Sequence, residues 1–419
     1  FPEKSETKTS SVCTYSGQTH GVELKLSMSS SSTIASAWKN TAAEAVAEKE
    51  TPEEAMDTVC PLDGSSFGMY YGQLQHQQNM LQDSVRTGMY QHAFLQNTSD
   101  FTGATVLDVG TGTGLLAFFA AQAGARKVYA VEHAGPMAEL ARLLVKGNSM
   151  EKVIEVMNCS VEKCGLKEKV DIIVSEPIGF LLVHERMLES FVQARDMYLR
   201  PGGLMMPSTS DIVVAPFTDE TLWAEQNGKG KFWSNASFHG IDLRPLVQQA
   251  SKEYMSQAVV GYFDESILIS SDRATHVVDF RTVTLPMLQT FEIPLVFRVG
   301  TTCLCHGVGC WFDAHFLGSS QHVTLSTAPD QTGTHWYQCR LLLAEPIAVN
   351  ASQVLSGSLR FVASSKISYT ITMSLKLDGT HITSTNKVNL QDQHYHYLQT
   401  GASHHSYDYS AEGSAAGTT

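Results

Sequence analysis

Two glutamates, Glu176 and Glu185, enclose an otherwise apolar loop in the stretch SEPIGFLLVHE. A carboxylate in apolar surroundings costs free energy unless a positive group pairs with it. The residues IVSEP read as the end of a strand, at the edge where open α/β sheets place their sites. We therefore expect both carboxylates to face a ligand crevice and to receive an arginine guanidinium, which is planar and keeps its charge. Alternatively, Glu185 lies only in the first turn of the helix ERMLESFVQA, where the helix dipole favours an acid.

A glycine-rich turn in the stretch LDVGTGTG predicts a second binding site. It contains Asp108, Gly110, Gly112 and Gly114. Glycines let a ligand approach the backbone closely, and Glu132, about 20 residues on, can hold both hydroxyls of a ribose. A dinucleotide fingerprint requires the pattern G-x-G-x-x-G, but here Gly114 comes one residue early and position 115 is leucine. An adenosine ligand without phosphates therefore fits better. S-adenosylmethionine is the expected cofactor; the alternative is a structural turn without a ligand.

One more acid follows the third strand of this region. Glu162, in the stretch CSVEK, is placed to accept a hydrogen bond from the amine of adenine. By residue type alone it could equally be a solvated surface glutamate.

Alternating strands and helices must position these residues. The strands are predicted in TVLDVG, KVYAVE, VIEVMN and VDIIVSEP, and the helices in GLLAFFAAQAG and PMAELARLLVKGN. This βαβ series indicates a parallel sheet wrapped by helices. After LRPGGLMMPS the chain is mostly short β-rich runs, which predict a barrel or sandwich interrupted by one helical, aromatic segment.

These patterns divide the chain into four parts. Residues 1–65 form an N-terminal segment, partly disordered, that could end a small β domain. Residues 66–208 hold N-terminal helices and a Rossmann-like cofactor-binding domain, and residues 209–390 hold a β-barrel substrate domain. The helical interruption lies at about residues 219–245, and residues 391–419 are expected to be a disordered tail.

Composition excludes some classes of protein. Apolar residues make up 43% and charged residues 17%, which suits a globular protein with a large core. No apolar run reaches about 18 residues, so no membrane span is expected. The eight cysteines form no disulfide framework, which favours a reducing intracellular setting. The net charge of −13 argues against direct nucleic-acid binding and allows a basic partner, although it could equally serve solubility.

Two smaller expectations follow from the sequence. The chain begins at Phe1 rather than methionine, so we expect it to be a piece of a longer protein. The stretch CLCHGVGC resembles a metal cluster, but strand alternation sends Cys303 and Cys305 to one face and His306 to the other. No metal is therefore expected.

Several motifs together resemble the protein arginine methyltransferases. They are LDVGTGTG, YAVE, SEP-G-LL--ERMLES and THWYQ. Within that family the chain most resembles the coactivator-associated branch, including its plant members. The motifs that indicate this branch are YYGQLQHQQNMLQD-VRTG-Y, APFTDE, SFHG-DL, WFD and STAPDQTGTHWYQ. The resemblance covers about residues 66–390 and implies a Rossmann-like S-adenosylmethionine-dependent methyltransferase domain followed by a β-barrel.

The resemblance also implies roles for matching positions. Arg86 would hold the methionyl carboxylate of the cofactor, with Ser190 near the adenine. The implied cofactor contacts are Gln77, Arg86, Asp108, Gly110, Gly112, Glu132, Glu162 and Ser190. The implied catalytic residues are Glu176, Glu185, His335 and Asp83, and the implied substrate contacts are Tyr71, Met80 and Trp336.

The implied activity is methylation of arginine in proteins, with S-adenosyl-L-homocysteine as the second product. Carboxylates that hold one side of the guanidinium draw its charge there and leave the target nitrogen more nucleophilic. The late base is either Glu185 or the His335–Asp83 pair. A methionine at Met80 implies monomethylarginine and asymmetric dimethylarginine. Implied substrates are histone tails and other nuclear or RNA-associated proteins, in nucleus and cytoplasm. The alternatives are an inactive scaffold and a methyltransferase for another small nucleophile.

The helical interruption resembles the dimerisation arm of these enzymes, so we expect a homodimer. The large apolar residues expected to be exposed on it are Leu222, Trp223, Phe232, Trp233 and Phe238. Several positions depart from the family pattern. They are Phe67 and Gly68 in place of Tyr-Phe, Ser84 in place of Tyr, Ile178 in place of Met, and His184 in place of Asn. The first change removes a tyrosine that would cover the cofactor and touch a loop glutamate, which puts turnover in doubt.

Overall fold

The computed structural model describes residues 70–396 except residue 366. The chain divides into two units, Phe1–Cys60 and Pro61–Thr419, and every described residue belongs to the second. The expectations for residues 1–65, for Phe67 and Gly68, and for residues 397–419 therefore lie outside the described residues.

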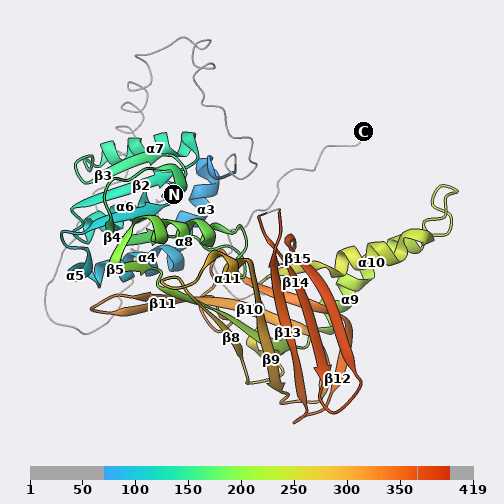
Figure 1. Ribbon diagram of the computed structural model, residues 1–419. Helices are drawn as coiled ribbons and strands as arrows, with labels where there is room; N and C mark the ends of the chain where they lie inside the picture. Colours follow the sequence, from blue (N-terminus) through green and yellow to red (C-terminus); the bar gives the residue numbers. More distant parts are fainter. Residues whose placement is uncertain (1–69, 366, 397–419) are drawn as a thin grey trace, which may run out of the picture. The chain divides into compact units, whose positions relative to one another are not determined.

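The first half of the described chain is a five-stranded parallel sheet in the order β3-β2-β1-β4-β5 (Figure 1). Its strands are β1 Thr105–Val109, β2 Lys127–Glu132, β3 Ile154–Asn158, β4 Val170–Ser175 and β5 Leu199–Met206. All five residues of β1 are buried, because helices cover both faces of a parallel sheet. The predicted βαβ series is confirmed. Because β1 lies between β2 and β4, its carboxyl end is the topological switch point, where such sheets bind ligands.

Helices cover this sheet and precede it. They are α3 Leu74–Gln82, α4 Ser84–Leu95, α5 Thr98–Phe101, α6 Leu115–Gln122, α7 Gly135–Gly147 and α8 Met187–Tyr198. Helices α6 and α7 pack against β2 and β3, whereas α8 packs against β4 and β5. The single helical pattern around QLQHQQNMLQ breaks at Asp83, which has extended backbone and accepts a hydrogen bond from the Arg86 amide as the N-cap of α4.

The second half is a nearly closed β-barrel in the order β8-β6-β10-β12-β7-β15-β14-β13-β9. Its strands are β6 Thr209–Phe217, β7 Gln257–Gly261, β8 Ala274–Asp279, β9 Thr290–Arg298, β10 Cys303–Leu317, β11 His322–Ser326, β12 Gln338–Val349, β13 Val354–Ala363, β14 Tyr369–Leu377 and β15 Thr383–Tyr395. The two end strands meet where the rings of His276 and Phe291 stack at 4.6 Å. The short helix α11 Leu285–Gln289 precedes β9 and contacts α8. The expected barrel is therefore present.

One boundary was wrong. Strand β15 continues to Tyr395, five residues beyond the expected end of the barrel domain at 390. After a bulge between Asn389 and Gln393 the strand pairs with β7, which gives its last residues backbone partners that composition does not reveal.

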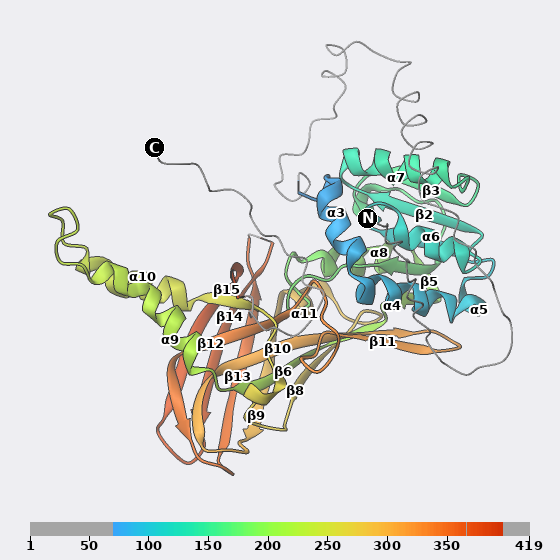
Figure 2. The same ribbon diagram turned by 180° about the vertical axis from the view of Figure 1, so that it is seen from behind.

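A helical arm leaves the barrel between β6 and β7 (Figure 1, Figure 2). It comprises α9 Glu220–Gly228, two 3₁₀ turns and α10 Val247–Met255, so it is longer than the expected 219–245. Three of the five residues predicted to be exposed are not, since Leu222 is buried and Trp223 and Trp233 are half-buried. Leu222 is 1% exposed, and Trp223 packs beside it and donates from Nε1 to the Leu343 carbonyl at 2.8 Å. They anchor the arm on its own barrel, because one face of α9 completes a small apolar cluster there.

Large apolar groups are nevertheless exposed beyond that anchor. They are Phe232, Phe238, Ile241 and Leu246. Within residues 70–396, no helix is both long and apolar enough to cross a membrane.

Candidate active site

The glycine-rich turn follows β1 and requires glycine at two positions. Gly110 and Gly112 have φ of 68° and 57°, in the left-handed region that side chains disfavour. A Cβ at Gly112 would lie 2.7 Å from Oε1 of Gln77, and a Cβ at Gly110 would overlap Cε of Met187. The structure thus brings Gln77 to the turn, as predicted, and adds Met187, which sequence analysis missed.

Two buried acids at this turn retain acceptor capacity. The Glu132 carboxylate accepts hydrogen bonds from the amides of Gly112 at 2.9 Å and Ala134 at 2.8 Å. Burial raises the pKa of Glu132, although these bonds oppose the shift. Asp108 is fully buried; Oδ2 accepts from the Thr111 hydroxyl, while Oδ1 has no hydrogen-bond partner in the described part of the chain. Burial raises the pKa of Asp108 to about 7.

Glu176 lies directly after β4 and is paired with Arg86 of the same chain. Nη2 and Nε of Arg86 donate to Oε2 of Glu176 at 2.8 Å and 3.1 Å. The two side chains are 10% and 9% exposed, so this is a buried ion pair. Sequence analysis assigned both residues to the site but missed their pairing; an arginine on a buried helix face was the available signal.

Glu185 ends the same loop in a different environment. The hydroxyl of Tyr71 lies 2.8 Å from both of its carboxylate oxygens. Burial raises the pKa of Glu185 to about 7; the Tyr71 hydrogen bond lowers it and the nearby Glu176 charge raises it. Burial, followed by the Glu185 charge, likewise raises the pKa of Tyr71. Tyr71 therefore touches a loop glutamate. The expectation of a missing tyrosine concerns Phe67 and Gly68, which lie outside the described residues.

The His335–Asp83 pair forms as predicted. Nδ1 of His335 lies 2.7 Å from Oδ2 of Asp83, which also accepts from the His335 amide at 2.8 Å. Burial raises the pKa of Asp83, but the hydrogen bonds from His335 and the Arg86 amide outweigh burial and leave it below the ordinary value. Asp83 thus joins the cap of α4 to the barrel.

Trp336 and Ile178 hold the β4–α8 loop. Trp336 is 3% exposed and donates from Nε1 to the Ile178 carbonyl at 3.0 Å. It therefore anchors the loop, and little of its surface is accessible to a substrate. The Ile178 amide donates to Oε1 of Glu176 at 3.1 Å. Met80 lies beside the buried pair, since its carbonyl is 3.4 Å from Nη1 of Arg86.

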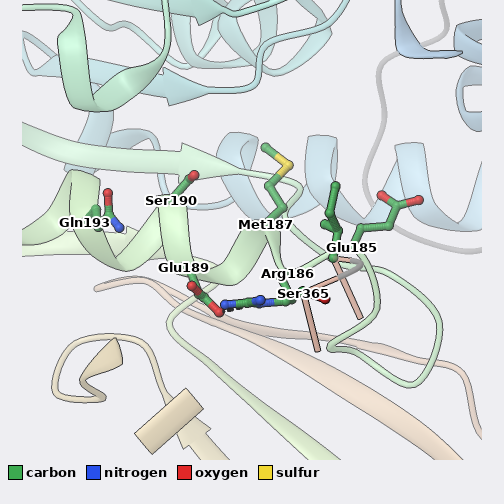
Figure 3. Close-up of a pocket in the computed structure, with 8 residues that line it drawn as sticks. Glu185, Arg186, Met187, Glu189, Ser190, Gln193 and Ser365 are labelled. Atoms are coloured by element: carbon green, nitrogen blue, oxygen red, sulfur yellow. Dashed lines mark hydrogen bonds and ion pairs between the residues drawn. The ribbon is translucent and has the colours of Figure 1, made fainter. Parts of the chain in front are cut away.

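The Ser190 hydroxyl donates to Oε1 of Glu162 at 3.0 Å, so the two residues expected near the adenine lie side by side. Beside them a cavity of about 320 Å³ opens along the start of α8 (Figure 3). Figure 3 shows Ser190 and Met187 on one side of α8 and the Arg186–Glu189 pair on the other, with the Glu185 carboxylate pointing away from that pair. The eight residues that line this cavity are Glu185, Arg186, Met187, Glu189, Ser190, Gln193, Ser365 and Ile367.

Two family models match the chain. A "Methyltransferase domain" model matches residues 106–203, and an "Arginine methyltransferase oligomerization subdomain" model matches residues 208–381. These ranges coincide with the parallel sheet and the barrel.

Individual relatives are also similar. The chain is 45% identical over 338 residues to the histone-arginine methyltransferase CARMER of Drosophila persimilis; the match covers 81% of this chain and 63% of that protein. A crystal structure of Arabidopsis thaliana protein arginine methyltransferase 10 is 33% identical, with a TM-score of 0.72, and the match covers 77% of this chain and 99% of that one. The Trypanosoma brucei PRMT1 enzyme–prozyme heterotetrameric complex with AdoHcy is 29% identical, with a TM-score of 0.69, and the match covers 76% and 99%.

Proposed function

Because this chain belongs to the protein arginine methyltransferase family, we propose that it methylates arginine in proteins, using S-adenosylmethionine and releasing S-adenosylhomocysteine. The observation that carries the proposal is the pair Glu176 and Glu185, which interact electrostatically at the two ends of one loop. Glu185 is half-buried and accepts a hydrogen bond from Tyr71, and desolvation raises its pKa to about 7. Perturbed acids in such a place are typical of a functional site.

The residues around the glycine turn fit the cofactor. Buried Asp108 Oδ1 has no hydrogen-bond partner among the described residues, and the absence of a side chain at Gly112 lets Gln77 approach the turn. Glu132 would hold the ribose, Arg86 the methionyl carboxylate, and Glu162 with Ser190 the adenine. When bound, the cofactor supplies an electrophilic methyl group on a sulfonium.

The loop carboxylates would prepare the substrate nitrogen. A guanidinium is a poor nucleophile because its lone pairs are delocalised, and two carboxylates on one side draw the positive charge away from the target nitrogen. Glu176 is held by Arg86 and Glu185 by Tyr71, so neither needs to reorganise before it meets a substrate.

We assign the proton acceptor to Glu185. The target nitrogen becomes acidic only as the methyl transfers, and a carboxylate whose pKa is about 7 suits that late step. His335 instead has Nδ1 engaged by Asp83, which is also fixed as the cap of α4. That pair would orient the barrel loop against α4.

The proposed substrates are arginine-containing protein segments such as histone tails. A chain with a net charge of −13 attracts basic segments at long range. The relative from Drosophila persimilis is a histone-arginine methyltransferase. Nuclear and cytoplasmic location follows from the same reasoning.

The proposed products are monomethylarginine and asymmetric dimethylarginine, with monomethyl more prominent than in relatives. The flexible thioether of Met80 can shift to admit the first methyl, whereas the β-branched Ile178 is stiffer and its backbone is fixed at both ends. Fragmentation spectra of the product should lack the neutral loss of symmetric dimethylarginine. Ile178→Met should raise the ratio of dimethyl to monomethyl product; an unchanged ratio rejects the role of Ile178.

The proposed assembly is a homodimer formed through the arm. The exposed Phe232, Phe238 and Ile241 would dock on the helices of a second copy's sheet domain. Light scattering at micromolar concentration should give a dimer mass, and Phe232→Ser with Phe238→Ser should give a monomer. A monomer mass for the unchanged chain excludes this arrangement.

The catalytic proposal is tested with labelled S-adenosylmethionine and a cell extract. Mass spectrometry should locate the label on arginine, and Glu185→Gln should abolish most of it, whereas the exposed Glu151→Gln should not. If the folded protein binds the cofactor but transfers no methyl group, the chain is instead a non-catalytic scaffold.

A further inference from the structure

The β4–α8 loop that presents Glu185 has an unfavourable backbone. Glu185 has a φ of 72° and Arg186 a φ of 57°; earlier in the loop, Leu181 has 51° and Leu182 has 68°. Non-glycine residues persist in this region only where the surroundings hold them there. The groups that hold Glu185 are therefore part of how the site works.

Both neighbours of Glu185 in the chain are tied to one turn of the barrel. Nδ1 of His184 lies 2.9 Å from the Ser368 hydroxyl, and Nη1 of Arg186 donates to the Ser364 carbonyl at 2.8 Å. The turn between β13 and β14 is itself closed by a 2.8 Å hydrogen bond from the Ser364 amide to the Ser368 carbonyl. The residues before and after Glu185 thus contact the two ends of one closed turn.

The contact at His184 is built into the interior. Ser368 is 0% exposed, and the His184 ring stacks on Phe180 with centroids 5.9 Å apart. Burial lowers the pKa of His184 to about 4, so the ring is neutral near neutral pH and can exchange one hydrogen bond with a hydroxyl. His184 is where family members commonly have asparagine, which also carries a donor and an acceptor.

We infer that His184 and Ser368 are positioning residues that fix the orientation of Glu185 from the barrel side, through a clamp made by the turn Ser364–Ser368. This inference rests on the proposed role of Glu185. In the clamp, the barrel holds the chain on either side of the catalytic carboxylate, while Tyr71 holds the carboxylate itself. Loss of the clamp should therefore lower kcat without changing the binding of the cofactor at the glycine turn.

Ser368→Ala removes the hydroxyl that binds His184, and the same turn offers a matched control. The Ser364 hydroxyl is buried but has no hydrogen-bond partner in the described chain, because Arg186 binds the Ser364 main-chain carbonyl. Ser364→Ala also deletes a serine hydroxyl, four positions before Ser368, and should behave like the unchanged protein. His184→Phe keeps a ring on Phe180 but loses the bond, whereas His184→Asn and Ser368→Thr preserve it.

The expected result is a loss in kcat between about tenfold and a hundredfold for Ser368→Ala and His184→Phe, because small displacements of a catalytic group cost that much. The KM for a peptide and the Kd for S-adenosylhomocysteine should change little. The double variant should be no worse than either single one, since both remove the same bond. His184→Asn and Ser368→Thr should retain most activity.

Two further readouts separate positioning from general stability. Amide hydrogen exchange in residues 178–187, measured without cofactor, should quicken in Ser368→Ala but not in Ser364→Ala. The acidic limb of the kcat/KM profile should move to lower pH, because a loosened Glu185 gains water while still facing Tyr71 and Glu176. If Ser368→Ala matches Ser364→Ala in kcat, exchange and pH profile, the clamp is overturned. If the unchanged protein transfers no methyl group, the proposed function is overturned instead of the clamp. If His184→Phe does not fold, the comparison of Ser368→Ala with Ser364→Ala tests the clamp without it.

Discussion

Glu176 and Glu185 are the same residue type at the two ends of one loop, yet their immediate surroundings differ. The Glu176 end follows β4 and is neutralised by Arg86 in a buried ion pair. Among the described residues, no cation lies within hydrogen-bond distance of the Glu185 carboxylate; Tyr71 is its donor, and burial raises its pKa to about 7. The surroundings of the two carboxylates therefore give them different roles. Glu176 stays ionised beside Arg86, whereas Glu185 can gain or lose a proton near pH 7.

The largest expected effect is on turnover in Glu185→Gln. Loss of one preorganised charge should raise the barrier by about 3 kcal/mol, which lowers kcat by roughly two orders of magnitude. The fold should survive. Burial raises the folded pKa of Glu185 above its unfolded value, so its ionised form costs stability above about pH 7. The melting temperature of Glu185→Gln at higher pH should therefore equal or exceed that of the unchanged protein; a lower one contradicts this description of Glu185.

Glu176→Gln should show the opposite effect on stability. It leaves the buried Arg86 guanidinium without a counter-charge, which typically costs about 3 kcal/mol or more. Thermal or urea unfolding should show this loss. The double variant Arg86→Leu with Glu176→Gln should recover part of the lost free energy of unfolding. If Glu176→Gln and Glu185→Gln are equally stable, the proposed difference between the two carboxylates is wrong.

The smallest effect is expected from Tyr71→Phe. The Tyr71 hydrogen bond favours ionised Glu185, so its removal should raise the Glu185 pKa further. The acidic limb of kcat/KM, which reports the free enzyme, should shift upward in pH while the plateau falls modestly. A limb that stays in place would show that Glu185 is not the titrating group.

Local patterns were sufficient to predict the parallel sheet, whereas they left a barrel or a sandwich open for the second half. Strand β2 has the bounds of the stretch KVYAVE, and the glycine turn, Glu132 and the loop glutamates lie at the expected edge of the sheet. Each of these depends on residues close in sequence, where periodicity and turn chemistry act.

Contacts between distant segments could not be predicted from local patterns; the His335–Asp83 pair, 252 positions apart, was expected only from the family resemblance. The Arg86–Glu176 pair spans 90 positions, Tyr71–Glu185 spans 114 and His184–Ser368 spans 184. Trp223 was misjudged for the same reason, because its partner is the Leu343 carbonyl on another strand. A pattern shows that a side chain is apolar or charged, but only the packed chain decides which partner it meets.

The measurement that tests the central claim most directly is the pH dependence of methyl transfer to an arginine peptide, followed by mass spectrometry, for the unchanged protein and Glu185→Gln. We predict methylated arginine whose rate of formation rises with pH through about 7, as Glu185 ionises, and a much slower reaction without that limb in Glu185→Gln. Equal rates and the same limb in both proteins would contradict the account.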